Sequence, residues 1–111
     1  MQDLATVLDD LGGLITESEK HILMHDALVR LKSNTDFIKV IEQGYLTNLA
    51  LTSVRRKGYD NCVGVVADAV EKDLIGIGRL NNYFESIAYT AVSARQSIVD
   101  ANRAIDEVQS N

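Results

Sequence analysis

Apolar residues alternate between steps of four and three residues through positions 80–108 of the chain. This period is the a/d pattern of a coiled coil, which needs a second helix packed against the apolar positions. The pattern predicts a long helix over residues 61–109. Three of the positions are alanine, so we expect the partner backbone to approach closely. The seam consists of Leu80, Phe84, Ile87, Ala91, Ala94, Ile98, Ala101, Ile105 and Val108.

The same rhythm extends upstream through Val70, Leu74 and Ile77, but the step from Ile77 to Leu80 is one residue short. A missing residue of this kind is a stammer, which locally overwinds a coiled coil. It falls on the two glycines of residues 76–78, and each glycine in a helix costs about 1 kcal/mol. We therefore expect a kink, a tight helix crossing or a break there.

Four shorter helices are predicted before the long one, over residues 3–11, 17–32, 35–43 and 46–57. Gly12 and Gly13 have the character of a C-terminal stop for the first helix. Thr16 and Glu19 have the spacing of a capping box, which predicts the start of the second helix. The apolar stripe assigned to that helix is Met24, Ala27, Leu28 and Leu31, flanked by Ile22 and Val29.

Turn chemistry bounds the third and fourth helices. Asn34 or Thr35 is expected to cap the third helix, and Gly44 is its expected end. The basic run Arg55–Lys57 followed by Gly58 is typical of the last turn of a helix and its exit. Tyr45 and Leu46 are expected to pack the turn after the third helix onto the long helix, and Tyr83 and Tyr89 to serve as packing or interface anchors.

These elements predict a single all-α domain over residues 1–111. The short helices together are about as long as the last one, so they can fold back and cover part of the seam. The expected fold is a helical hairpin or small bundle with a long C-terminal heptad helix. We expect it to oligomerise by coiled-coil packing through whatever part of the seam remains exposed.

Composition narrows the class of protein. The chain has 111 residues, 46% of them hydrophobic, with no proline, no tryptophan and one cysteine. This excludes a disulfide scaffold and argues against a β-sandwich. The N-terminal residues lack the pattern of a secretory signal and no apolar run could span a bilayer, so no membrane association is expected. The net charge of −5 disfavours wrapping of nucleic acid.

Candidate chemistry is sparse. His21 and His25 lie four residues apart and could share a zinc or nickel ion, but a zinc protease needs glutamate where Ile22 stands. Histidines on the surface or partly packed are the favoured interpretation. Cys62, the one thiol, is placed just inside the start of the long helix and is interpreted as a small core residue. No catalytic residue, metal or cofactor is predicted, and the chain is not expected to be an enzyme.

The basic run Arg55, Arg56 and Lys57 is the one concentration of positive charge in an acidic chain, and Tyr59 follows it. Three cations beside an aromatic ring could contact a phosphate backbone or an acidic partner. Their position at a helix end offers a structural reason for the same residues. Both interpretations remain open from the sequence.

Two stretches together resemble a family. Residues 30–46 carry the pattern Arg-Leu…Asn-x-Asp-Phe-x-x-x-Ile-x-x-Gly-Tyr, and residues 77–87 carry Ile-Gly-x-Leu-x-x-Tyr-Phe-x-x-Ile. The chain resembles small α-helical proteins of tailed bacteriophages that have no characterised activity. Residues 49–54 depart from the family pattern, which has an Asp-Pro segment there. The resemblance implies a phage protein encoded near head or packaging genes, located in the virion or the host cytoplasm.

The first hypothesis for function is a non-enzymatic phage structural or virion-assembly protein. It would oligomerise with itself, and contact other phage proteins, through the C-terminal helix. The alternative is a small acidic inhibitor or adaptor that binds a host or phage nucleic-acid enzyme. A packaging factor that contacts nucleic acid through Arg55, Arg56 and Lys57 is the third and weakest hypothesis, because the acidic balance makes nucleic acid an unfavourable partner.

Overall fold

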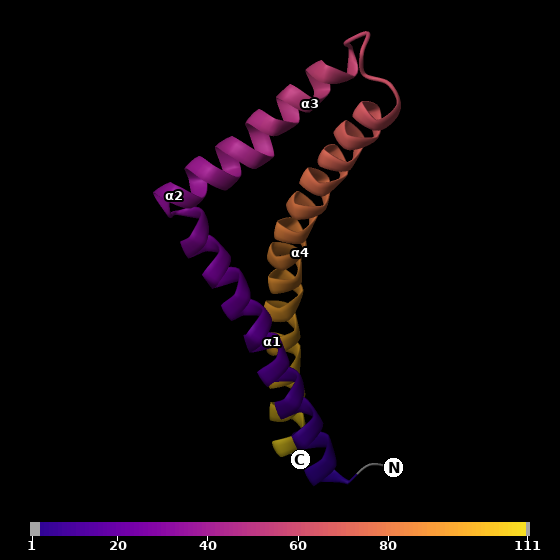
Figure 1. Ribbon diagram of the computed structural model, residues 1–111. Helices are drawn as coiled ribbons and strands as arrows, with labels where there is room; N and C mark the ends of the chain where they lie inside the picture. The colour runs from indigo at the N-terminus through magenta and orange to yellow at the C-terminus, as the bar shows by residue number, and fades with distance from the viewer. Residues whose placement is uncertain (1–2, 111) are drawn as a thin grey trace. The chain divides into compact units, whose positions relative to one another are not determined.

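The computed structural model describes residues 3–110, which are almost entirely helical and contain no strand (Figure 1). The all-α class and the long C-terminal helix predicted from the heptad pattern are confirmed. The elements in chain order are helix α1 (Leu4–Lys32), the short helix α2 (Thr35–Phe37), the π-helix η1 (Ile38–Leu49), helix α3 (Ala50–Lys57) and helix α4 (Gly64–Gln109).

Two compact units divide the contacts of the chain. Unit 1 combines the part of α1 up to Leu28 with the part of α4 from Ser86 onward. Unit 2 comprises residues 29–85, which hold the end of α1, then α2, η1, α3 and the first part of α4.

Unit 1 is an antiparallel pair of helices built on the seam. Ala91, Ala94 and Ala101 of α4 are buried, with 0%, 4% and 2% of their surface exposed. Residues of α1 and α4 line one shared groove, Ser18 and Ala94 among them. The short alanine side chains allow this close approach. None of the nine seam residues is exposed. From Ile87 onward, in unit 1, the partner helix that the heptad pattern demanded is α1 of the same chain.

The matching face of α1 also alternates steps of three and four residues, and the sequence analysis did not recognise it. This face is buried or half-buried and comprises Leu8, Leu11, Ile15, Ser18, Ile22 and His25. The stripe predicted instead is wrong for three of its four members. Met24 and Leu31 are 52% and 45% exposed, Ala27 is exposed, and only Leu28 is buried.

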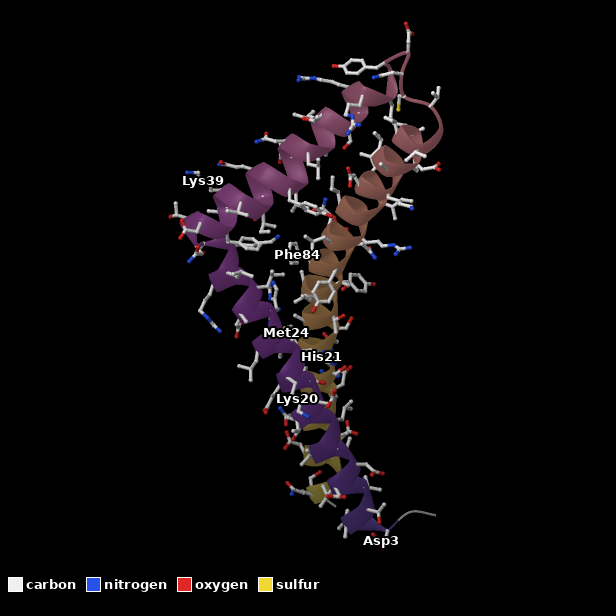
Figure 2. The ribbon with its side chains drawn as sticks, in the orientation of Figure 1. Asp3, Lys20, His21, Met24, Lys39 and Phe84 are labelled. Atoms are coloured by element: carbon white, nitrogen blue, oxygen red, sulfur yellow. The ribbon has the colours of Figure 1, made fainter. Side chains whose placement is uncertain are left out.

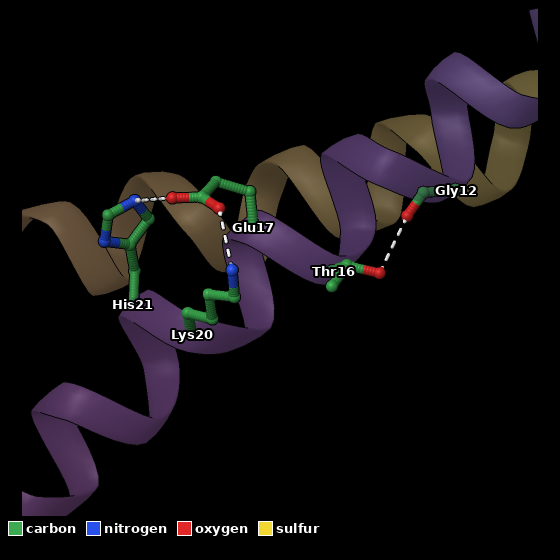
Figure 3. A network of polar contacts seen from close by, with 5 residues as sticks. All are labelled: Gly12, Thr16, Glu17, Lys20 and His21. Atoms are coloured by element: carbon green, nitrogen blue, oxygen red, sulfur yellow. Dashed lines mark hydrogen bonds and ion pairs between the residues drawn. The ribbon is translucent and has the colours of Figure 1, made fainter.

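The predicted helix end at Gly12 and Gly13, and the start at Thr16, are wrong because α1 runs unbroken from Leu4 to Lys32. Thr16 does not cap a helix: its Oγ1 donates to the Gly12 carbonyl at 3.1 Å (Figure 3). Two helical glycines cost about 2 kcal/mol, and burial of the continuous apolar face of α1 outweighs that cost.

The true start of α1 is capped by Asp3. Its Oδ1 accepts the backbone N–H of Thr6 at 2.8 Å. This hydrogen bond favours the ionised carboxylate and lowers the pKa of Asp3 below its ordinary value of 3.8.

In unit 2, Asn34 caps the next helix as predicted, since its Oδ1 accepts the Phe37 N–H at 3.0 Å. The predicted end at Gly44 is wrong, because the π-helix η1 carries the chain past it to Leu49. Thr47 Oγ1 donates to the Glu42 carbonyl, five residues back, at 2.8 Å, in keeping with the wider turn of a π-helix. A Cβ at Gly44 would lie 3.3 Å from the Lys39 carbonyl oxygen, so glycine suits this position without ending the helix.

Helix α4 is unbroken through residues 76–78, so of the three outcomes expected there the break is not found. A Cβ at Gly76 would lie 2.9 Å from Tyr45 Oη, so the tip of the Tyr45 side chain reaches the backbone of α4. This contact agrees with the predicted packing of Tyr45 on the long helix. Val70 and Ile77 of α4 are buried, with 0% and 5% exposed.

Aromatic side chains join the helices of unit 2. The rings of Phe37 and Phe84 meet edge to face with centroids 6.0 Å apart, and Tyr83 lies against Phe84 at 6.2 Å. Lys32 Nζ stands 5.4 Å from the centre of the Phe84 ring (labelled in Figure 2). Phe84, a seam residue, therefore anchors α2 and the end of α1 to α4.

The non-helical connection between α3 and α4 is longer than predicted. Helix α3 ends at Lys57 with Gly58 as its cap, as the basic run predicted. The predicted start of the long helix at residue 61 is wrong, because α4 begins at Gly64, whose φ of +56° favours glycine. Cys62 therefore lies in the turn, where its N–H donates to the Tyr59 carbonyl at 3.0 Å.

The two glycines of residues 76–78 should respond differently to alanine. Gly78→Ala meets nothing within 4 Å and should stabilise the protein by about 0.5–1 kcal/mol through helix propensity. Gly76→Ala should gain less, because its Cβ displaces Tyr45 Oη at the end of a flexible side chain. Combining it with Tyr45→Phe should recover part of the difference. Urea unfolding measures all four proteins, and equal gains for both alanine variants would contradict the contact between Tyr45 and Gly76.

The Asp3 cap should fail in acid. Because the pKa of Asp3 is lowered in the folded chain, the cap is complete above the ordinary value of 3.8 and is lost as the pH falls through the lowered value. Amide hydrogen exchange at Thr6 and Val7 should accelerate over that range. Asp3→Asn keeps an acceptor that does not titrate, so its exchange, corrected for intrinsic rates, should stay flat there.

Candidate functional site

A pocket lies where α3 turns back into α4. It has a volume of about 440 Å³, within the range of small-ligand sites. The glycine cap after α3 and the turn over residues 59–63 bring the end of α3 beside the start of α4. The basic pocket, as we call it, is lined by Thr52, Arg55, Arg56, Tyr59, Asn61 and Val66.

The three cations of the basic run divide into two kinds. Lys57 Nζ is 3.1 Å from Glu71 Oε2 on α4, so its charge is already paired. Arg55 and Arg56 line the pocket, and neither makes an ion pair within residues 3–110. Every polar side chain in the lining can donate a hydrogen bond, and no carboxylate is among them. The pocket is therefore suited to an anion.

The sequence identified only part of this pocket. It singled out Arg55, Arg56 and Tyr59, which line the pocket. It also grouped Lys57 with them, but in the structure Lys57 pairs with Glu71 instead. Thr52, Asn61 and Val66 were not recognised, because only the chain reversal between the helices brings them to the arginines. The turn residues Gly58 to Asn61 were the available signal.

A smaller groove of about 220 Å³ lies on unit 1 between α1 and α4. Its one titratable pair is on α1, where His21 Nε2 lies 3.9 Å from Glu17 Oε1, and Lys20 Nζ lies 3.4 Å from the other oxygen of that carboxylate (Figure 3). The rest of the lining is apolar or hydroxyl-bearing: Leu14, Ser18, Thr90, Ser93, Ala94 and Ser97.

The remaining candidates are dispersed. His25 is half-buried on the face of α1 that packs in unit 1, and its Nδ1 is buried without a hydrogen-bond partner. No group of three or more histidine, cysteine or acidic residues within 3–110 is arranged to hold a metal ion. Cys62 is a half-buried free thiol in the turn before α4 and does not line the basic pocket.

The opposite face of α4 in unit 1 carries apolar residues that no other residue within 3–110 covers. Tyr89, Val92 and Val99 are 77%, 65% and 50% exposed, and Gln96 between them is also exposed. Their steps of three, four and three residues continue the coiled-coil rhythm on a second face. We call these four residues the outer stripe.

Comparisons with protein-family models, with curated proteins and with solved structures find no match to this chain. No helix within the described residues is both long enough and apolar enough to cross a membrane.

Proposed function

We propose that the chain is a non-enzymatic assembly protein of a tailed bacteriophage and that it self-associates through the outer stripe of α4. One observation carries the proposal. The part of the seam in unit 1, expected to bind a partner, is already covered by α1, whereas the opposite face of the same helix leaves Tyr89, Val92 and Val99 exposed. The C-terminal helix remains the interacting element, but the contact uses its outer stripe and not the seam.

The charges beside the outer stripe favour a second copy of this chain as the occupant. In heptad terms, the a positions of the outer stripe are Tyr89 and Gln96, and its d positions are Val92 and Val99. Arg95 then falls at g, and Asp100 falls at the following e position. In a parallel, in-register pair of α4 helices, each Arg95 faces Asp100 of the other copy. Opposite charges at g and e are the pairs that set partner and orientation in parallel coiled coils.

The polar residue in the stripe fits the same arrangement. Gln96 would meet Gln96 of the second copy, and one polar a position fixes register at a cost in stability. Gln96 Nε2 donates to Asp100 Oδ1 at 2.9 Å, which holds the carboxylate beside the stripe. The stripe ends at the next a position, Arg103, so the contact is short and the association is expected to be reversible.

The phage setting is supported by the resemblance of residues 30–46 and 77–87 to small phage proteins. In those stretches, Asn34 caps a helix, while Phe37, Tyr45 and Phe84 pack unit 2. These are structural roles, in keeping with a protein that assembles.

Counting copies of the chain per capsid subunit in purified phage particles would decide whether it is a virion component or acts only during assembly.

Replacing Val92 with aspartate should abolish self-association. It would place a charge in the centre of the contact, which costs about 3–5 kcal/mol when unpaired and so weakens the dimer by at least about 100-fold. The matched control is Val54→Asp on α3, where valine is 59% exposed compared with 65% at Val92. Light scattering after size exclusion should give twice 12.2 kDa for the wild type and the control, and 12.2 kDa for Val92→Asp.

Charge exchange provides the specific test of the parallel register. Arg95→Glu and Asp100→Arg should each weaken the dimer, and the double variant should restore it. A monomeric wild type, an unchanged mass for Val92→Asp, or additive weakening in the double variant would contradict the arrangement.

The acidic inhibitor or adaptor remains a second candidate because charge is unevenly distributed. The parts of the chain in unit 1 hold nine acidic and three basic residues, whereas unit 2 holds seven and eight. A stable monomer that captures a defined nucleic-acid enzyme through unit 1 would favour this candidate over the assembly protein.

A further inference from the structure

We infer that the basic pocket binds a nucleotide, with its phosphate held by Arg55 and Arg56 and its base stacked on Tyr59. This activity is independent of self-association, because the pocket belongs to unit 2 and the outer stripe to unit 1.

The two arginines supply the phosphate recognition. The planar guanidinium group offers paired donors that match two oxygens of a phosphate, which a lysine ammonium cannot do. Arg56 is half-buried and Arg55 is exposed, and both line the same pocket with no ion pair to neutralise them. Lys57 is directed instead to Glu71 at 3.1 Å. The pocket therefore keeps two positive charges for a ligand.

The other polar groups extend the same preference. The Asn61 amide and the hydroxyls of Thr52 and Tyr59 stand around the pocket and can donate to oxygen atoms of the ligand. Asn61 also carries an acceptor, so it can pair with the edge of a base. A lone carboxylate or inorganic phosphate would fill only a small part of 440 Å³, which argues for a larger anion.

One wall of the pocket is suited to a flat, apolar group. The Tyr59 side chain is 59% exposed, and Val66 lies in the same lining with 36% exposed. An exposed aromatic ring beside unpaired arginines is the combination by which proteins hold single nucleotides, since bases stack on the ring while phosphates meet the cations.

The charge of the remaining surface limits the ligand to one or two nucleotides. The chain carries a net charge of −5, and Arg55–Lys57 is its one cluster of three adjacent cations. A long strand would leave this cluster within a few nucleotides and meet an acidic surface, which gains no counterion release. The affinity for oligonucleotides should therefore stop rising once they are longer than about two nucleotides.

The test titrates the full chain with inorganic phosphate, AMP, and thymidine oligonucleotides of two and twelve residues, followed by amide chemical shifts. AMP should shift resonances within residues 52–66 and bind about tenfold tighter than phosphate, because only AMP can stack on Tyr59. The two oligonucleotides should bind within about twofold of each other once the number of sites on the longer one is counted.

Matched variants separate the pocket from general charge. Arg56→Ala and Arg55→Ala should each weaken AMP binding about tenfold. Lys57→Ala removes the same charge from the same run and should weaken AMP binding less than either arginine variant, because Lys57 does not line the pocket. Tyr59→Leu should weaken AMP without changing phosphate binding, and Tyr59→Phe should retain most of the affinity. Circular dichroism checks that each variant keeps its helix content.

Three results would overturn the inference. The first is equal weakening by Lys57→Ala and Arg56→Ala, which would show only diffuse charge attraction. The second is equal affinity for phosphate and AMP, which would show that no base is bound. The third is affinity that grows strongly from two to twelve nucleotides, which would indicate an extended nucleic-acid surface. The monomeric Val92→Asp variant should bind AMP as the wild type does, so failure of self-association leaves this test intact.

Discussion

Small side chains along one face of α4 determine how closely α1 can lie against it in unit 1. Ala91, Ala94 and Ala101 project little from the helix and are almost completely buried, and Ser18 of α1 lines the same groove as Ala94. Larger residues at these positions would hold the helices apart and leave the half-buried Ile15, Ile22 and Ile98 open to water. This contact therefore fixes which faces of both helices remain available for partners.

The covered seam changes the functional interpretation more than any other feature. A heptad pattern demands a partner helix but does not say whether that helix comes from the same chain. Here α1 supplies it in unit 1, so the association that we propose uses another surface, the outer stripe. In unit 2 the chain reversal after α3 has a different consequence. It gathers residues from a helix end, a turn and a helix start around two arginines, while Glu71 neutralises the neighbouring lysine.

Features that depend on local sequence were predicted well. The all-α class, the long C-terminal helix, the Asn34 cap and the end of α3 before Gly58 all follow from periodicity and capping chemistry. Predictions based on glycine as a helix end failed at residues 12–13 and 44, because packing of an apolar face outweighs the small cost of a helical glycine. The face of α1 was misassigned since a division at Gly12 hid its continuous heptad. The basic pocket was predicted only in its cations, because Thr52 and Asn61 meet them through the fold.

The central claim, that α1 covers the seam of its own chain, is tested most directly by a disulfide between Ser18→Cys and Ala94→Cys in a Cys62→Ser background. A mixture of unlabelled and ¹⁵N-labelled protein should be unfolded together, refolded and oxidised, and the linked peptides analysed by mass spectrometry. The account predicts links only within chains, so no peptide pair should combine the two labels. In an equal mixture, mixed-label pairs making up about half of the linked product, the share expected from random pairing between chains, would show that α1 packs on the seam of another copy and would contradict the account.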